Sequence, residues 1–185
     1  MICKEVFKGK FVTVRSAEVD DSEITLRMRM DPERTKYLHA VEGTVEGQRA
    51  WLAKQREREG DYLFVCENRQ GDVIGMVGLY EIENGKGHLG RLLMYGSAVE
   101  SFEATILVME YGFYKLGLRE MIGDVDERNT ASLRFSKSLG LKFNAPIYDA
   151  SLDRNVLMGV VTRDSFQESI RPIKRWIYPE IYRRK

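Results

Sequence analysis

A hairpin in the middle of the chain constrains the fold more than any other sequence feature. An apolar, β-rich run at 62–66 is followed by a polar turn at 68–72 and by a second apolar run at 73–80. Gly75 and Gly78 interrupt the second run and predict a β-bulge or a close approach of another backbone. The chain therefore contains an antiparallel sheet.

Further strand and helix patterns flank this hairpin. Before it, the sequence predicts a strand at 11–15, a helix capped at 20–22 that ends near Met30, and a helix at 45–57 capped by Thr44. After it, we predict a strand at 88–94, a helix at 98–116, a strand at 120–125, a helix at 130–139 and a hairpin at 148–163. This order indicates an α/β (α+β) fold with a mixed, mostly antiparallel central sheet flanked by helices.

Length and charge narrow the classes of protein to consider. The 185 residues fit one domain, placed here at 1–163, followed by a basic C-terminal extension at 164–185. A net charge of +1 argues against a nucleic-acid partner. There is no signal-peptide pattern and no run near the roughly 18 apolar residues of a membrane span, so a cytoplasmic protein without a membrane partner is expected. Cys3 and Cys66 have no metal-ligand spacing, so no metal is expected.

The segment 126–141 carries the most specific pattern. It combines the end of a strand, an asparagine that can cap a helix, a short helix and a Leu-Gly stop, in Asn129, Ser132, Leu133, Phe135, Leu139 and Gly140. This pattern resembles the last signature of the GNAT superfamily of N-acetyltransferases. Matching segments precede it, namely His88-Leu-Gly90-Arg-Leu-Leu93, Tyr111-Gly-Phe113 and Leu116-Gly-Leu118. The resemblance covers about 11–161 and implies the GNAT fold, in which two central strands splay into a V-shaped split.

The resemblance implies transfer of an acetyl group from acetyl-CoA to a primary amine. Asp31-Pro32-Glu33 and Trp51-Leu52 resemble the acceptor-side helices of two branches, which acetylate nucleotide-linked aminosugars and the N-termini of ribosomal proteins. The acceptor is then a small-molecule amine or a peptide N-terminus. Tyr80 and five predicted substrate-binding residues could line its pocket: Arg29, Tyr37, His39, Trp51 and Glu81. The sequence leaves open whether the chain forms a homodimer through the segment after Val161.

The expected coenzyme loop departs from the family pattern. The family's pyrophosphate loop contains glycines, whereas the matching residues 98–104 contain none. Glu100 and Glu103 would repel a pyrophosphate, although acids are also favourable in the first turn of an ordinary helix. By resemblance, the coenzyme-binding residues are Arg91, Leu92, Leu93, Ala98, Val99, Glu100, Ser101, Phe102, Glu103 and Asn129.

Two residues stand at the family's catalytic positions. His88 stands where many members carry a glutamate base, and an imidazole suits deprotonation of an ammonium near neutral pH; a strand-edge histidine without a role is the alternative. Ser136 replaces the usual tyrosine acid and is a poor proton donor, for which Tyr95 and Tyr148 are possible substitutes. The glycine-free loop and Ser136 also leave open a GNAT-like binding module without catalysis.

Overall fold

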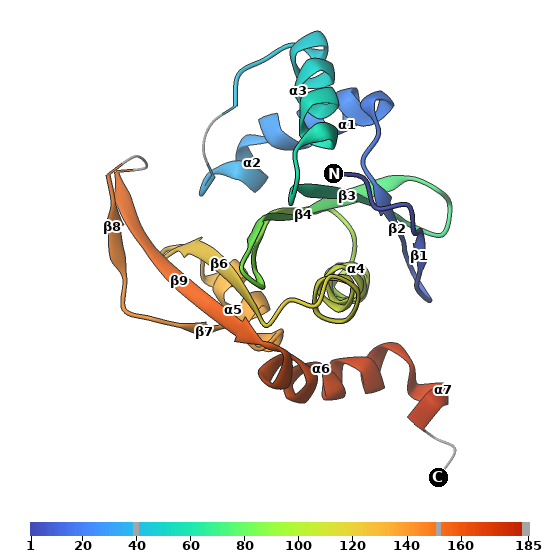
Figure 1. Ribbon diagram of the computed structural model, residues 1–185, viewed down its shortest axis with the longest axis vertical. Coiled ribbons are helices and arrows are strands. Elements are labelled where there is room, and N and C mark those ends of the chain that lie inside the picture. Colours follow the sequence, from blue (N-terminus) through green and yellow to red (C-terminus); the bar gives the residue numbers. More distant parts are fainter. Residues whose placement is uncertain (39–40, 151–152, 183–185) are drawn as a thin grey trace.

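The computed structural model describes residues 1–38, 41–150 and 153–182 and confirms the mixed α/β architecture (Figure 1). Within these residues a 9-stranded, largely antiparallel sheet has the order β1-β2-β3-β4-β5-β6-β9-β7, with β8 paired to β9. The strands are β1 (Phe7–Lys8), β2 (Thr13–Ser16), β3 (Tyr62–Glu67), β4 (Val73–Glu83), β5 (Lys86–Met94), β6 (Glu120–Asp126), β7 (Lys142–Phe143), β8 (Ile147–Asp149) and β9 (Arg154–Thr162).

The helices begin close to the caps expected from the sequence. They are α1 (Ser22–Met30), α2 (Pro32–Thr35), α3 (Val45–Glu57), α4 (Ala98–Glu110), α5 (Thr130–Ser138), α6 (Arg163–Ile177) and α7 (Pro179–Tyr182), with a 3₁₀ turn η1 (Val19–Asp21) and a π-helical turn η2 (Tyr111–Lys115). Thr44 and Asn129 each accept a backbone N–H at the start of their helix, which confirms both predicted caps. No helix in the described part of the chain is long and apolar enough to cross a membrane.

The predicted hairpin of β3 and β4 lies at the centre of the sheet, with apolar layers on both of its faces. Phe64 and its alternate neighbours pack in the cluster that includes α4 and α6, whereas Leu63 and Val65 pack in the cluster with α1 and α3. Figure 1 accordingly shows α1, α2 and α3 on one side of this hairpin and α4 and α6 on the other. A strand covered on both faces explains why the run at 62–66 is almost entirely apolar.

The C-terminal helix α6 is part of this core. It begins at the cap Thr162, and Phe166, Ile170 and Ile177 are buried in the same cluster as α4. Most of the segment that the sequence marks as a basic extension, at 164–185, is thus one amphipathic helix whose apolar side chains cover the sheet.

The V-shaped split lies between β5 and β6. These parallel strands pair only at Lys86–Glu120, Gly87–Met121 and His88–Ile122, and their later residues separate. On the other edge of β5, the register with β4 shifts between the pairs Met76–Leu93 and Gly78–Gly90, so β5 carries one extra residue there. The bulge contains Arg91, which has a left-handed backbone with φ of 49°. The split was expected from the family resemblance, and Gly78 predicted an irregularity here, although the extra residue lies in β5 and not in the strand of Gly78.

Candidate active site

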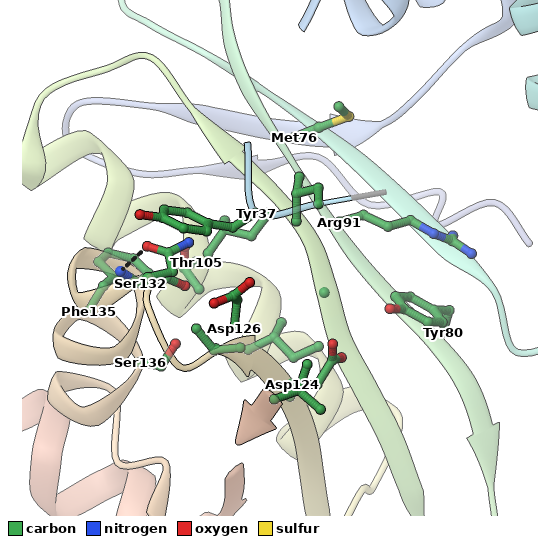
Figure 2. Close-up of a pocket in the computed structure, with 18 of the residues that line it drawn as sticks. Tyr37, Met76, Tyr80, Arg91, Thr105, Asp124, Asp126, Ser132, Phe135 and Ser136 are labelled. Atoms are coloured by element: carbon green, nitrogen blue, oxygen red, sulfur yellow. Dashed lines mark hydrogen bonds between the residues drawn. The ribbon is translucent and has the colours of Figure 1, made fainter. Parts of the chain in front are cut away.

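A cavity of about 580 Å³ opens where β5 and β6 separate. In Figure 2, side chains of α5 lie on one side of it and those of β4 and β5 on the other, with Asp124 and Asp126 of β6 between them. We call the first side the hydroxyl wall, made of Thr105, Asn129, Ser132, Phe135 and Ser136. We call the second side the arginine wall, made of Arg29, Trp51, Tyr80 and Arg91.

Arg91 is the best-anchored side chain of the arginine wall. Its Nη1 donates to Oδ1 of Asp61 at 2.5 Å and its Nη2 to Oδ2 at 3.2 Å. The guanidinium carbon lies 4.0 Å from the centre of the Tyr80 ring and 5.4 Å from that of the Trp51 ring. Asp61 is buried and also accepts a hydrogen bond from Gln55. A bidentate ion pair between two aromatic contacts fixes where this positive charge points.

Gly78 makes room for the arginine wall, and Arg29 adds a second charge beside Arg91. A Cβ at Gly78 would lie 3.1 Å from both Cβ and Cδ of Arg91, so the glycine leaves room for this side chain to pass. Burial, followed by the charge of Arg91, lowers the pKa of the Arg29 guanidinium. The two guanidinium groups therefore present positive charge to the same part of the cavity.

Asp124 connects the cavity to His88. The Nε2 of His88 lies 2.7 Å from Oδ1 of Asp124, and its Nδ1 lies 3.6 Å from the exposed carboxylate of Glu81. The imidazole stacks on Tyr80 with ring centres 4.8 Å apart. The hydrogen bond to His88 holds the pKa of the Asp124 carboxyl below its usual value, while burial raises the pKa of the Tyr80 phenol to about 12. Asp124 is thus ionised at neutral pH beside a neutral phenol.

A second carboxylate, Asp126, holds two arginines at the end of β6. Arg128 donates to both of its oxygens, at 3.0 and 2.8 Å, and Nη1 of Arg154 lies 3.3 Å from Oδ2. The side chain of Arg154 is 9% exposed and lines the cavity. Its Nε is the one buried side-chain N or O atom in the described part of the chain that has no hydrogen-bond partner. This N–H is a donor that a bound molecule could use.

The hydroxyl wall is built mainly from one face of α5. Asn129 Oδ1 accepts the backbone N–H of Ser132 at 3.0 Å, which fixes the first turn, and Ser136 follows one turn after Ser132. Phe135 stacks on Phe102 of α4 with ring centres 4.5 Å apart, which fastens the two helices together. Small polar groups and one ring therefore line this side, a surface suited to a neutral, flexible chain.

Comparison with known proteins identifies the fold. A family model described as "Acetyltransferase (GNAT) domain" matches residues 12–142, more than half of the chain. The chain belongs to the GNAT acetyltransferase family. The probable N-acetyltransferase YjcK of Bacillus subtilis (strain 168) is 30% identical over 156 residues, covering 73% of this chain and 82% of that protein. The uncharacterized N-acetyltransferase p20 of Bacillus licheniformis is 26% identical over 159 residues, covering 80% of this chain and 89% of that protein.

Solved GNAT structures share the architecture. The apo form of FdhC, a nucleotide-linked sugar GNAT, superposes with a TM-score of 0.79 at 20% identity, covering 95% of this chain and 99% of that chain. A GCN5-related N-acetyltransferase from Brucella melitensis gives a TM-score of 0.80 at 20% identity, covering 96% of this chain and 87% of that chain. The chain is therefore a GNAT-type N-acetyltransferase that uses acetyl-CoA as its co-substrate.

This GNAT cavity gathers part of the predicted site. It is lined by Arg29, Tyr37, Trp51, Arg91, Leu92, Asn129 and Ser136. Other predicted residues lie outside its lining: Glu81, His88, Leu93, Ala98, Val99, Glu100, Ser101, Phe102 and Glu103. His39 lies outside the described residues. Tyr95 and Tyr148, the suggested substitutes for the missing acid, donate to Asp31 and Asp153 and do not line the cavity either.

Glu103 has a separate structural position. Its buried carboxylate accepts the backbone N–H groups of Lys10, Phe11 and Val12 at 2.6, 2.7 and 3.0 Å, and the hydroxyl of Tyr178. It thereby joins α4 to the N-terminal strands and to the end of α6. A carboxylate engaged by this many donors on the far side of α4 is not available to the cavity.

Sequence reasoning missed Asp124, Asp126 and Arg154 as cavity residues. A signal was present, since Asp124 and Asp126 alternate with Gly123 and Val125 in a strand that ends just before Asn129. Charged residues inside an otherwise apolar strand of a sheet usually face a site or a partner. No group of three or more His, Cys, Asp or Glu side chains among the described residues could hold a metal ion.

Proposed function

We propose that this GNAT acetyltransferase transfers acetyl groups to the primary amine of a nucleotide-linked aminosugar. The observation that carries the proposal is that Arg29, Arg91 and Arg154 all line one cavity together with aromatic rings. Guanidinium groups bind phosphate oxygens through paired N–H donors, and aromatic rings stack on bases and sugars. An acceptor that carries both phosphates and rings matches this combination.

The contacts of these arginines favour an anionic acceptor. The bidentate pair with Asp61 uses two of the five N–H donors of Arg91, and Nε of Arg154 is buried without a partner. Burial and, after it, the charge of Arg91 lower the pKa of Arg29, and a phosphate bound between Arg29 and Arg91 would offset the repulsion between the two charges. The same arrangement gives no such stabilisation to a neutral or cationic acceptor.

We propose that His88 and Asp124 act together as the base. An acceptor ammonium would pass a proton to the carboxylate of Asp124, which faces the cavity and shares its other side with Nε2 of His88 at 2.7 Å. The proton is then shared across the 2.7 Å contact between Asp124 and Nε2 of His88, so the pair, rather than Asp124 alone, is the proposed base. His88 thus keeps the role predicted from the sequence but exerts it through Asp124.

The transfer step then follows in the split between β5 and β6. The free amine attacks the thioester carbonyl carbon, the new C–N bond forms, the C–S bond breaks, and the proton lost from the nitrogen passes to the departing coenzyme thiolate to give the thiol. The family resemblance gives the backbone N–H of Leu93 the role of polarising the carbonyl, although Leu92 and not Leu93 lines the cavity. Ser136 lines the cavity and can donate a hydrogen bond to the departing sulfur.

The test measures thiol release from acetyl-CoA with matched acceptor panels. Nucleotide-linked aminosugars, the same aminosugars without the nucleotide, and short peptides with free N-termini would be compared at equal concentration. We expect kcat/KM to be at least about 100-fold higher for the nucleotide-linked acceptors, since two or more phosphate contacts are lost in the others. Equal or better rates with the peptides would replace this proposal by acetylation of protein N-termini.

A variant at His88 tests the proposed base independently of acceptor binding. In His88→Ala we expect kcat to fall about tenfold. The acid limb of the kcat/KM profile should move to higher pH, because the hydrogen bond that lowers the pKa of Asp124 is lost. Full activity with an unchanged pH profile would remove His88 from the mechanism.

A further inference from the structure

The N-terminus of α4 is closed by a side chain of the same helix. Oε2 of Glu100 accepts the backbone N–H of Ser97 at 2.8 Å and its hydroxyl at 2.7 Å. In return, the backbone N–H of Glu100 donates to Oγ of Ser97 at 3.4 Å. This reciprocal capping box places a carboxylate directly at the positive end of the helix.

This helix end belongs to the edge of the sheet at which the split opens. β5 ends at Met94 and α4 starts at Ala98, so the connection leaves β5 on the side where it has already separated from β6. Thr105, two turns along α4, lines the cavity, and Phe102 stacks on the cavity residue Phe135. An acyl thioester lying in the split would therefore direct the far end of its carrier toward the first turn of α4.

Coenzyme A would fit well at the split between β5 and β6 but poorly at the first turn of α4. The split and the hydroxyl wall suit the thioester and the neutral pantetheine arm. The first turn of α4 does not suit a diphosphate, because the Glu100 carboxylate, held there by the N–H and the hydroxyl of the cap Ser97, adds a negative charge. Its Oε2 would lie 2.9 Å from a Cβ at Gly96, so the carboxylate also covers the backbone at the one glycine beside the helix start.

We infer that Glu100 sets the donor specificity of this enzyme by withholding the α4 N-terminus from the phosphates of coenzyme A. The pantetheine arm then supplies most of the binding, and acetyl thioesters of pantetheine serve nearly as well as acetyl-CoA. The inference rests on the proposed function, because it concerns the thioester donor of the same reaction.

Calorimetric titration of the whole protein with free coenzyme A and with free pantetheine tests the inference without any turnover. For the native protein we expect the two dissociation constants to agree within about fivefold. Glu100→Gln keeps a hydrogen-bonding side chain at the cap but removes its charge. In this variant we expect coenzyme A to bind about tenfold more tightly at low salt, with pantetheine unchanged.

Two controls exclude a general effect of charge or of lost helix stability. Asp164 is an exposed acid in the first turn of α6, so Asp164→Asn removes the same charge at another helix start and should leave both dissociation constants unchanged. Glu100→Asp keeps the charge and should keep the native ratio of the two dissociation constants, for coenzyme A and for pantetheine. Thermal unfolding of each variant verifies that the protein remains folded.

The outcomes distinguish the inference from the proposed function. The role of Glu100 would be overturned if the native protein bound coenzyme A more than about 100-fold more tightly than pantetheine and Glu100→Gln bound coenzyme A no more tightly than the native protein. That result would leave the proposed acetyl transfer intact. Binding of neither ligand to the native protein or to Glu100→Gln would overturn both.

Discussion

The two walls of the cavity differ in how their side chains are held. On the arginine wall, Arg91 is locked by Asp61 and by two rings, and each partner comes from a different element. On the hydroxyl wall, Asn129, Ser132 and Ser136 follow one another along a single helix. The first wall can discriminate strongly between acceptors because its charges are fixed by tertiary contacts. The second offers a uniform polar surface along which one chain can lie.

Between the two walls, β6 supplies the carboxylates that neither wall contains. Asp124 faces the cavity with its pKa lowered by His88, and Asp126 holds Arg154. In the proposed function, the arginine wall recognises the acceptor, the hydroxyl wall places the donor and the strand between them accepts the proton. Variants in each region should change different kinetic constants.

The largest effect is expected at the carboxylate between the walls. Asp124→Asn removes the proposed proton acceptor while keeping the size of the side chain, so kcat should fall about 100-fold or more. KM for the acceptor should change little, since the arginine wall is intact. Steady-state thiol release measures both constants, and a KM effect without a kcat effect would transfer Asp124 from catalysis to binding.

A smaller and different effect is expected on the arginine wall. Arg91→Leu should raise the acceptor KM about 30-fold, the equivalent of about 2 kcal/mol for a charge-assisted contact, and leave the donor KM unchanged. The variant also removes the bidentate partner of the buried Asp61, which keeps Gln55 and, at 3.7 Å, Arg58, and it should lower the free energy of unfolding.

The double variant Arg91→Leu with Asp61→Leu separates these two consequences. It removes the buried carboxylate that has lost its bidentate partner and should recover stability in denaturant unfolding, while the acceptor KM stays high. Recovery of the KM together with stability would mean that Arg91 supports the fold and does not contact the acceptor.

The smallest effect concerns stability in acid. The folded-state pKa of Asp124 lies below the ordinary aspartate value of 3.8, so its ion pair with His88 stabilises the protein above that value and is lost as pH falls below it. Unfolding free energies measured between about pH 5 and about pH 3 should therefore decline less steeply in Asp124→Asn than in the native protein. Identical slopes would show that the His88 contact contributes nothing to folding.

Local sequence signals predicted the helices and the central hairpin well. Thr44 and Asn129 act within a few residues of their own position, and both caps appear where the sequence predicts them. The prediction of a continuous helix at 98–116 was less accurate, because α4 gives way to a π-helical turn at Tyr111–Lys115. The short strands β1 and β7 have too few residues for a detectable alternation.

The sequence by itself determined the resemblance to the family, the order of the main strands and helices up to 163 and the absence of glycines at 98–104, because these depend on residues close together in the chain. Only the tertiary structure decided which charges meet. His88 and Asp124 are 36 positions apart, and Glu103 reaches Lys10 across 93. Glu100 and Glu103 lie on the same helix, yet one closes its first turn and the other is buried on its far side. Such roles follow from the packing of separate elements, which no local pattern encodes.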